Sequence, residues 1–493
     1  MMKKFIIKTG MLGLLLVGLS ACSDNYFDVN TPSGTAEEEE LRVSDLMAPV
    51  MYRALAGQYS AEQSFGNYTQ YFVGEGGVAS GETTASGLWS SVYLYTLPNV
   101  ETIKEKAAEI GAIHYSAVAD ILTAINLGIA TDTWNNIPYT EATDGEDNLF
   151  PTFDTQESIY TEIFALLDTA IAQLQQTDDS GTYLGTDDLI YAGDTDKWLR
   201  AAYTLKARYQ LHLVGKGTVS ASDVLTTIEN GFESNDDDFQ MFYDDEDQNP
   251  WYSVEVVAKS TGNYHNDLAS QLVSSMNGDY FPFQSNALTI DPRLPVFGDN
   301  DGEDEWKGYV SGGGGLSPDG TSGNTGFAED GYYTSIDSPL LLISYAEAQF
   351  IKAEAAFLAN GGTTTSVGSS TVAYEAYLAG VEASLAKYDV DGSDYLADGA
   401  IAVGESGLML QHIMKEKYIH NFLNPETFVD YRRYDFSDDV FKGLSIRQEI
   451  DSDGDYAGEW FRRATYPTTE EYTNPDNVAA NKVTPVTPVW WDE

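Results

Sequence analysis

Cysteine is almost absent from this chain, which has a single one, Cys22, among its 493 residues. A lone cysteine cannot form an intramolecular disulfide, so the fold must be held by packing. Long apolar runs are also scarce. The run at 11–19 contains Gly13 and Gly18 and is shorter than the roughly 20 residues that a membrane-spanning helix needs. No later stretch is predicted to span a bilayer.

Positive charge is the second shortage. The chain has 26 Lys and Arg residues against 77 Asp and Glu residues, giving a formal net charge of −51. Such a surface repels phosphate backbones and anionic headgroups. We therefore expect no nucleic-acid partner. Histidine is also rare, and the five present lack the spacing of a zinc site.

What the first residues do contain is the layout of a secretory signal peptide. Lys3, Lys4 and Lys8 give a positive start, an apolar run follows, and small residues in "LSAC" lead to Cys22. This stretch resembles a bacterial lipobox, which implies cleavage after residues 1–21 and lipidation of Cys22. Each CH₂ of an acyl chain that is buried in the bilayer contributes about 0.8 kcal/mol to membrane binding. The predicted membrane contact is therefore a lipid anchor.

The remaining chain divides by composition. Residues 22–40 are polar and acidic and are predicted to be a tether. Residues 41–493 are predicted to form one domain, with helical blocks at about 100–230 and 338–423 and a loop-rich insertion at about 231–337. The insertion is rich in Gly, Asp, Asn and aromatic residues, and loops on a rigid frame often carry binding function.

Apolar residues recur at helical spacing in several segments of the two blocks. Small residues recur where these helices would touch, as in tetratricopeptide-like repeats. The expected fold is therefore mainly α, a tetratricopeptide-like helical frame with an irregular, loop-rich cap. The helical segments are a stretch with Ile121, Ile125 and Ile129 ending before residue 131, then 158–174, 195–214, 341–359, 373–388 and 407–422.

Aromatic side chains make up 12% of the chain, and exposed aromatic faces flanked by hydrogen-bonding groups suit sugar rings or peptides. For each ring, core packing is the competing interpretation. The loop that ends at Trp89 is expected to lie on the same side as the insertion. The candidate ligand-binding residues are Trp89, Trp251, Tyr252, Asn263, Tyr264, Asp267, Trp306 and Tyr309.

A series of motifs in order along the chain resembles the SusD-like (SusD/RagB) outer-membrane lipoproteins of Bacteroidetes. "FDVNTPSGT" and "LWSSVYLYTLPNV" are similar to the start of that family. "TDTWNNIPYTEA" resembles its D-x-W-G-D-I-P-Y-x-E-A turn, with Asn135 where glycine is usual. "KWLRAAYTLKARYQLHL", "DPRLPVF", "IMKEKYIHNFLNPETFVDYRRYDF" and "FRRATYPTTEEYTN" continue the resemblance towards the C-terminus.

The resemblance implies a nutrient-binding protein that is not an enzyme. Such proteins sit on the outer membrane, facing the cell exterior, and deliver an oligosaccharide to a SusC-like TonB-dependent transporter. Peptide capture, as by RagB-like members, is the alternative within binding. The chain has no H-E-x-x-H, G-x-S-x-G or P-loop motif. With 77 acidic residues, a glycosidase pair of carboxylates remains a further alternative.

Two more features invite an interpretation from the residues alone. Arg432, Arg433, Arg462 and Arg463 are expected to be structural partners of carboxylates, with a ligand role as the alternative. No cofactor is expected, although three Asp-Gly segments partly match a calcium loop, and the resemblance keeps calcium open. The segment at 387–398 carries Asp389, Asp391, Gly392 and Asp398; the others lie at 297–308 and 449–460, and ordinary Asp-Gly turns also explain all three.

Overall fold

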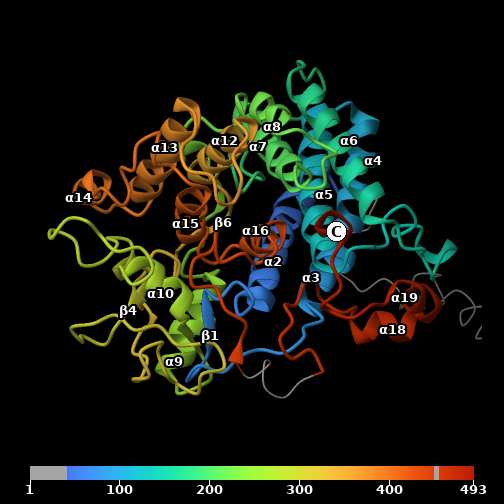
Figure 1. Ribbon diagram of the computed structural model, residues 1–493. Coiled ribbons are helices and arrows are strands. Elements are labelled where there is room, and N and C mark those ends of the chain that lie inside the picture. The colour runs from blue at the N-terminus through green and yellow to red at the C-terminus, as the bar shows by residue number, and fades with distance from the viewer. Residues whose placement is uncertain (1–40, 449–454) are drawn as a thin grey trace, which may run out of the picture. The chain divides into compact units, whose positions relative to one another are not determined.

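The helices of the first block pack as successive neighbours. In the computed structural model, which describes residues 41–448 and 455–493, α4 contacts α5, α5 contacts α6, α6 contacts α7, and α7 contacts α8 (Figure 1). This block consists of α4 (Leu97–Ile110), α5 (Ile113–Trp134), α6 (Gln156–Leu174), α7 (Thr195–His212) and α8 (Ala221–Ile228). The predicted leader, the tether up to residue 40 and Cys22 lie outside the described residues.

The second block continues the stack, because α12 contacts both α8 and α13. Helix α15 then packs against α12 and α13. All these elements belong to the unit Val43–Glu493. The block consists of α12 (Tyr345–Ala359), α13 (Thr371–Lys387), α14 (Ser393–Ala397), α15 (Leu410–His420) and α16 (Glu426–Arg433). The mainly α, tetratricopeptide-like prediction is confirmed.

Side-chain caps set where these helices begin. Thr155 accepts from the amide of Ser158 before α6, and Asp194 accepts from the two amides after Thr195 before α7. Such caps satisfy amides that would otherwise lack a partner in the first turn. Ser344 caps α12 in the same way. The residues just before it were predicted to be helical, but Leu340–Ile343 form strand β6 instead.

Helix α5 extends through Trp134, further than predicted, and ends at Asn135 with φ of 76°. That conformation favours glycine, which is the usual residue at this position of the motif that "TDTWNNIPYTEA" resembles. Here the Asn135 side chain stays engaged, because its Oδ1 accepts from the amide of Trp490 at 2.7 Å.

Contrary to the sequence expectation, α5 is long and apolar enough to cross a membrane. Its apolar window is 78% buried, as in the core helix of a soluble protein.

One long helix was not predicted. Helix α2 (Val43–Phe65) packs against α4, α5 and the segment around α3. Pro49 lies inside it, a residue that usually breaks helices. The neighbouring elements are α3 (Ser86–Ser90), the π-helical turn η3 (Ser91–Thr96) and the short helical turn η4 (Gly145–Asp147).

The insertion contains short strands and helices between its loops. A four-stranded antiparallel sheet has the order β1-β3-β5-β4, and β2 pairs with β6. Strand β1 comes from outside the insertion, so the sheet fastens the insertion to the start of the chain. We call residues 239–337 the cap. The strands are β1 (Phe72–Gly74), β2 (Phe239–Met241), β3 (Asn266–Leu268), β4 (Gly298–Asp299) and β5 (Gly326–Phe327).

Short helical elements complete the cap and the C-terminal region. In the cap these are η6 (Tyr252–Val257), α9 (Ala258–Ser260), α10 (Ser270–Met276) and α11 (Leu294–Phe297), preceded by η5 (Asn235–Asp237). Near the C-terminus they are α18 (Thr468–Thr473), α19 (Pro475–Asn481) and η7 (Trp490–Asp492). Trp491 of η7 is buried and reaches the frame helices.

Candidate functional site

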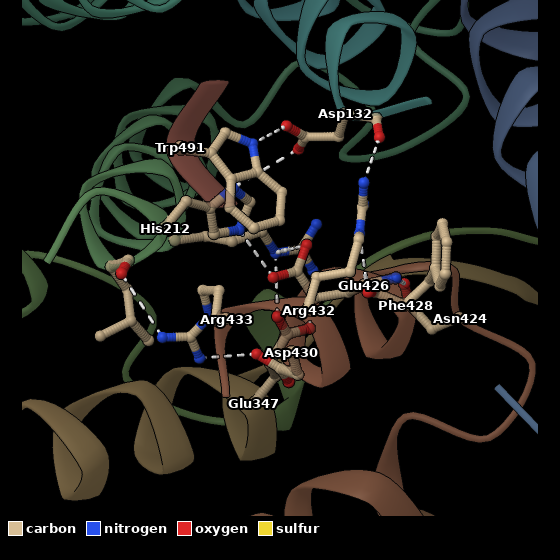
Figure 2. Close-up of polar contacts among 12 residues, drawn as sticks. Asp132, His212, Glu347, Asn424, Glu426, Phe428, Asp430, Arg432, Arg433 and Trp491 are labelled. Atoms are coloured by element: carbon tan, nitrogen blue, oxygen red, sulfur yellow. Dashed lines mark hydrogen bonds and ion pairs between the residues drawn. The ribbon is translucent and has the colours of Figure 1, made fainter. Parts of the chain in front are cut away.

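A chain of buried polar groups crosses the frame helices (Figure 2). The ring of His212 lies between Tyr160, whose hydroxyl is 2.8 Å from Nδ1, and Glu426, whose Oε1 is 2.7 Å from Nε2. Asp132 accepts from Tyr160 and from the indole of Trp491, both at 2.7 Å. His212 is 1% exposed. Burial lowers its pKa, but the charges of Glu426 and Asp132 outweigh burial and raise the pKa to about 8.

Buried guanidinium–carboxylate pairs extend this chain. Arg208 forms two bonds to Glu347, at 2.8 and 2.6 Å, and Arg433 binds Glu354 and Asp430. We call this set of residues the frame network. It comprises Asp132, Tyr160, Arg208, His212, Glu347, Glu354, Lys417, Glu426, Asp430 and Arg433.

Two of the four arginines singled out in the sequence have the expected carboxylate partners. Arg433 binds Glu354 and Asp430, and Arg462 binds Asp492 and Asp435. Arg432 instead donates to the backbone carbonyls of Phe428, Asp132 and Arg462, and its guanidinium lies over the rings of Phe428 and Trp491. Arg463 likewise donates to the carbonyls of Thr487 and Pro488.

The frame network holds acid–base side chains, but its geometry is that of a structural core. A cleft of about 510 Å³ borders it, lined by His212, Arg432, Arg433, Arg462 and other residues near the C-terminus. Both ring nitrogens of His212 are already engaged by protein groups. Burial raises the pKa of Glu426, but His212 and Arg208 hold it at about 2. The network therefore joins α5, α6, α7, α12, α15 and α16 rather than offering a site.

The cap has a different kind of polar region, an open groove of about 440 Å³. We call it the cap groove. It contains Trp306, one of the predicted ligand-binding residues, and many groups that can hydrogen-bond to a ligand. The lining residues are Ser274, Asn277, Asp279, Thr289, Ile290, Asp304, Glu305, Trp306, Lys307, Gly308, Ser317, Pro318 and Asp319.

Close backbone packing positions Trp306 in the groove. The segment after it runs beside α10, where Tyr309 and Ala269 form a parallel bridge. A side chain at Gly308 would lie 2.7 Å from the carbonyl oxygen of Ala269 and from the Cα of Ser270, so only glycine permits this approach. The carbonyl of Trp306 also accepts from Asn277 at 3.0 Å. Trp306 is thus fixed at a half-buried position.

Charged groups of the groove are held in place by their neighbours. The ammonium of Lys307 lies 2.9 Å from Glu305 and 3.0 Å from Asp319. Hydrogen bonds from Ser317 and Thr321 lower the pKa of Asp319 below its usual range. These contacts keep Asp319 ionised and leave Lys307 already bound to two carboxylates. A half-buried indole beside such groups can stack on a ring while they bind hydroxyls or amines.

Two predicted tryptophans lie in the core instead. Trp251 is 1% exposed and packs against Tyr59, Phe72 and Phe327. Trp89 is 8% exposed and packs against Tyr93, Trp134 and Tyr466. Neither ring offers an open face for stacking, so the expectation of an exposed aromatic surface fails at these two positions.

The other predicted residues, Tyr252 excepted, gather around the cap sheet. Tyr264 is 64% exposed, and Asn263 beside it is exposed too. Asp267 on β3 accepts from the amide of Gly76 at 3.0 Å. Burial and the charge of Asp267 raise the pKa of Tyr309 to about 12. Tyr252 is half-buried at the start of η6. A ligand role for these residues stays a prediction.

Calcium also stays a prediction. In 41–448 and 455–493, no group of three or more His, Cys, Asp or Glu side chains could hold a metal ion. In the segment 387–398, Asp391 accepts from the amide and hydroxyl of Ser393, and Asp398 accepts from the amides of Gln284 and Ser285. The segment at 449–460 lies partly outside the described residues.

Sequence reasoning missed most of the cap groove. It did not select the polar residues that flank Trp306, among them Asn277, Asp279 and Asp319. They lie on separate loops and have no common spacing, so no pattern joins them. It also took no functional or structural meaning from His212. The nearest signal there was its place on the predicted helix 195–214 among few other histidines.

Comparison with known proteins places the chain in a family. The SusD-like family model described as "Starch-binding associating with outer membrane" matches residues 35–467. A comparison with curated proteins finds no match.

Solved structures share the fold. A SusD/RagB family protein from Bacteroides thetaiotaomicron is 23% identical with a TM-score of 0.67, covering 92% of this chain and 99% of that one. A chitin-binding SusD homologue from Flavobacterium johnsoniae is 22% identical with a TM-score of 0.68, covering 92% and 98%. A SusD homologue from Bacteroides fragilis is 18% identical with a TM-score of 0.69, covering 92% and 100%.

Proposed function

Because the chain belongs to the SusD-like family, we propose that it captures a nutrient oligosaccharide in the cap groove. Cys22 would carry the lipid that anchors it to the outer membrane, with the domain facing the cell exterior. The bound oligosaccharide would pass to a SusC-like TonB-dependent transporter. The description of the family supports the association with the outer membrane and with a glycan.

The observation that carries the proposal is the combination of Trp306 with hydrogen-bonding groups in an open groove of about 440 Å³. An indole face covers the apolar face of a sugar ring, while side chains around it bind hydroxyl groups. Asn277 and Asp279 are placed for this, since their side chains are linked at 2.9 Å and border the groove. The related chitin-binding protein from Flavobacterium johnsoniae makes a glycan the first class to test.

We propose binding without catalysis. A glycoside hydrolase needs one carboxyl with a raised pKa as general acid, beside a second carboxylate. Asp319 does not fit the acid role, because its hydrogen bonds lower its pKa. Glu255 in the cap has its pKa raised to about 7 by burial, but it is 2% exposed, bound to Asn266 and not among the residues that line the groove. The acid–base groups of the frame network are buried and engaged by other side chains.

Peptide capture is the second candidate. The feature that favours it is the polar lining of the groove, where the side chains of Ser274, Asn277 and Asp279 could bind backbone groups of a peptide. A peptide ligand would bind such groups through its own backbone. The same titration distinguishes the two ligands, because a peptide digest can be included beside the glycans.

The deciding experiment is a calorimetric titration of the lipid-free protein, residues 23–493, against neutral glucans, mannans, xylans, chitin oligosaccharides and a peptide digest. We expect micromolar binding of one glycan with no cleavage. Trp306→Ala should weaken that binding. Trp490→Ala is the matched control, because Trp490 is also half-buried but lies near the C-terminus. Cleavage of the glycan, or binding of peptide alone, would contradict the proposal.

The anchor and the transporter need separate tests. A Cys22→Ala variant cannot accept the lipid, so we expect it to leave the membrane fraction and to lose its exposure to protease added outside the cell. The wild-type protein, solubilised with its lipid, should co-purify with a TonB-dependent transporter. Membrane retention of the Cys22→Ala variant would refute lipid anchoring at this residue.

A further inference from the structure

The lining of the cap groove is dominated by negative charge. Four of its residues are acidic, Asp279, Asp304, Glu305 and Asp319, and one is basic, Lys307. All four acidic residues are exposed. A groove lined with one sign of charge concentrates ligands of the opposite sign. The charges therefore bear on which glycan the groove accepts.

The single lysine does not offset this potential for a ligand. Its ammonium contacts Glu305 at 2.9 Å and Asp319 at 3.0 Å, and hydrogen bonds to these carboxylates raise its pKa. It also donates to the hydroxyl of Thr321. Lys307 is thus engaged within the protein, and a ligand carboxylate would have to compete with two carboxylates to reach it.

Two of the acidic residues remain well placed for a cationic ligand. Asp279 accepts from the amide group of Asn277, a neutral donor, and borders the groove as an exposed side chain. Asp304 is exposed two residues before Trp306. A sugar ring stacked on the indole of Trp306 would carry its substituents in the field of these carboxylates. An ammonium substituent gains from that field, whereas a carboxylate substituent is repelled.

We infer that the cap groove selects amino sugars, taking oligosaccharides with protonated glucosamine units in preference to neutral or uronate-bearing ones. This inference rests on the proposed function, since it assigns a substrate class to the same groove. It also follows the overall charge of −51, which disfavours anionic ligands over the whole surface.

The test compares β-1,4-linked oligomers of equal length made of glucosamine or of N-acetylglucosamine, which differ only in the charge and acylation of nitrogen. At about pH 6 most sugar amines are protonated, because this pH lies more than one unit below the α-amino range of about 7.7–8.0. We expect calorimetry at low salt to give about three- to ten-fold tighter binding of the glucosamine oligomer. The preference should disappear at about 0.5 M NaCl, where charges are screened within a few ångströms.

Variants assign the preference to the groove. Asp279→Asn with Asp304→Asn should remove most of the preference, because the affinity for the glucosamine oligomer should fall by more than the affinity for the N-acetylglucosamine oligomer. The matched control is Asp179→Asn, which removes one exposed carboxylate from the loop after α6 and should keep the preference. An oligogalacturonate should bind more weakly than either oligomer at low salt.

The outcomes separate this inference from the proposed function. Equal affinity for the two oligomers at low salt, or a preference that survives in the double variant, would overturn the selection of amino sugars while a glycan still binds. If none of the glycans binds, the proposed function fails, and the inference fails with it.

Discussion

The frame network and the cap groove use the same kinds of residue in opposite ways. In the frame network, Arg208, His212 and Arg433 form ion pairs or hydrogen bonds with carboxylates that are also buried. In the cap groove, the carboxylates are exposed and their main cation, Lys307, is half-buried. Charged side chains therefore indicate a ligand site only where solvent can be replaced by a ligand.

The two regions also place their tryptophans differently. Trp491 is buried, donates to Asp132 and covers the guanidinium of Arg432. Trp306 is half-buried at the wall of the groove. An aromatic ring stabilises the fold in the first case and is available to a ligand in the second. Variants of the frame network should accordingly act mainly on stability, and variants of the cap groove mainly on binding.

The largest effect is expected from breaking the frame network. Arg208→Met leaves Glu347 buried without its bidentate partner, which should lower the free energy of unfolding by about 3–5 kcal/mol. Glycan affinity of the folded fraction should stay unchanged. Chemical denaturation and calorimetry measure the two quantities.

Lys206→Met is the control for that variant. Lys206 lies on the same helix, α7, but pairs with the exposed Asp168, so its loss should change stability by less than about 1 kcal/mol. Equal losses for Arg208→Met and Lys206→Met would show that burial does not distinguish the network from a surface pair.

The cap also contains a buried acid, Glu255, but its partner is a neutral asparagine and not a cation as in the frame network. Glu255 accepts from the backbone and side chain of Asn266, and burial raises its pKa to about 7. Since the folded pKa exceeds the unfolded value, its stabilising effect is present below about pH 4.5 and is lost as pH rises through about 7. Glu255→Gln should therefore stabilise the protein by about 2–3 kcal/mol at pH 8 and have little effect at pH 4. A gain that does not vary with pH would argue against this titration.

One buried carboxyl of the helical frame has no hydrogen-bond partner, and replacing it should give a smaller gain in stability. Glu62 on α2 is fully buried, neither carboxyl oxygen has a hydrogen-bond partner, and burial raises its pKa well above the usual range. Glu62→Met should stabilise the protein by about 1–3 kcal/mol near neutral pH. Thermal unfolding provides the measurement. A loss of stability would mean that a polar group satisfies Glu62 in solution.

The smallest effect is expected in the groove. Trp306→Ala should weaken glycan binding about tenfold, or about 1.4 kcal/mol, because truncating a central aromatic contact typically has an effect of this size. The free energy of unfolding should change by less than it does for Arg208→Met, since Trp306 is only half-buried. Calorimetry compares the variant with Trp490→Ala, and equal binding by both would place the ligand outside the groove.

Local patterns predicted the frame well, and their failures have physical reasons. Apolar spacing and caps such as Asp194 mark α6, α7, α12 and α13. Helix α2 escaped prediction, and Pro49 inside it is a breaking signal. The aromatic rings show the limit of composition. Nothing near Trp251 in sequence shows that Tyr59 and Phe327 bury it, whereas Trp306 stays at the surface.

The sequence by itself determined the helical frame, the absence of disulfides, the acidic surface and the family, because these depend on local periodicity, composition and ordered motifs. Tertiary structure alone decided which charges are saturated and which are open. Asp132, His212 and Glu426 come from distant parts of the chain and meet in the core. The cap groove likewise exists only where separate loops converge. Burial and hydrogen-bond saturation are properties of packing between distant segments, and they divide the framework from the proposed binding groove in this protein.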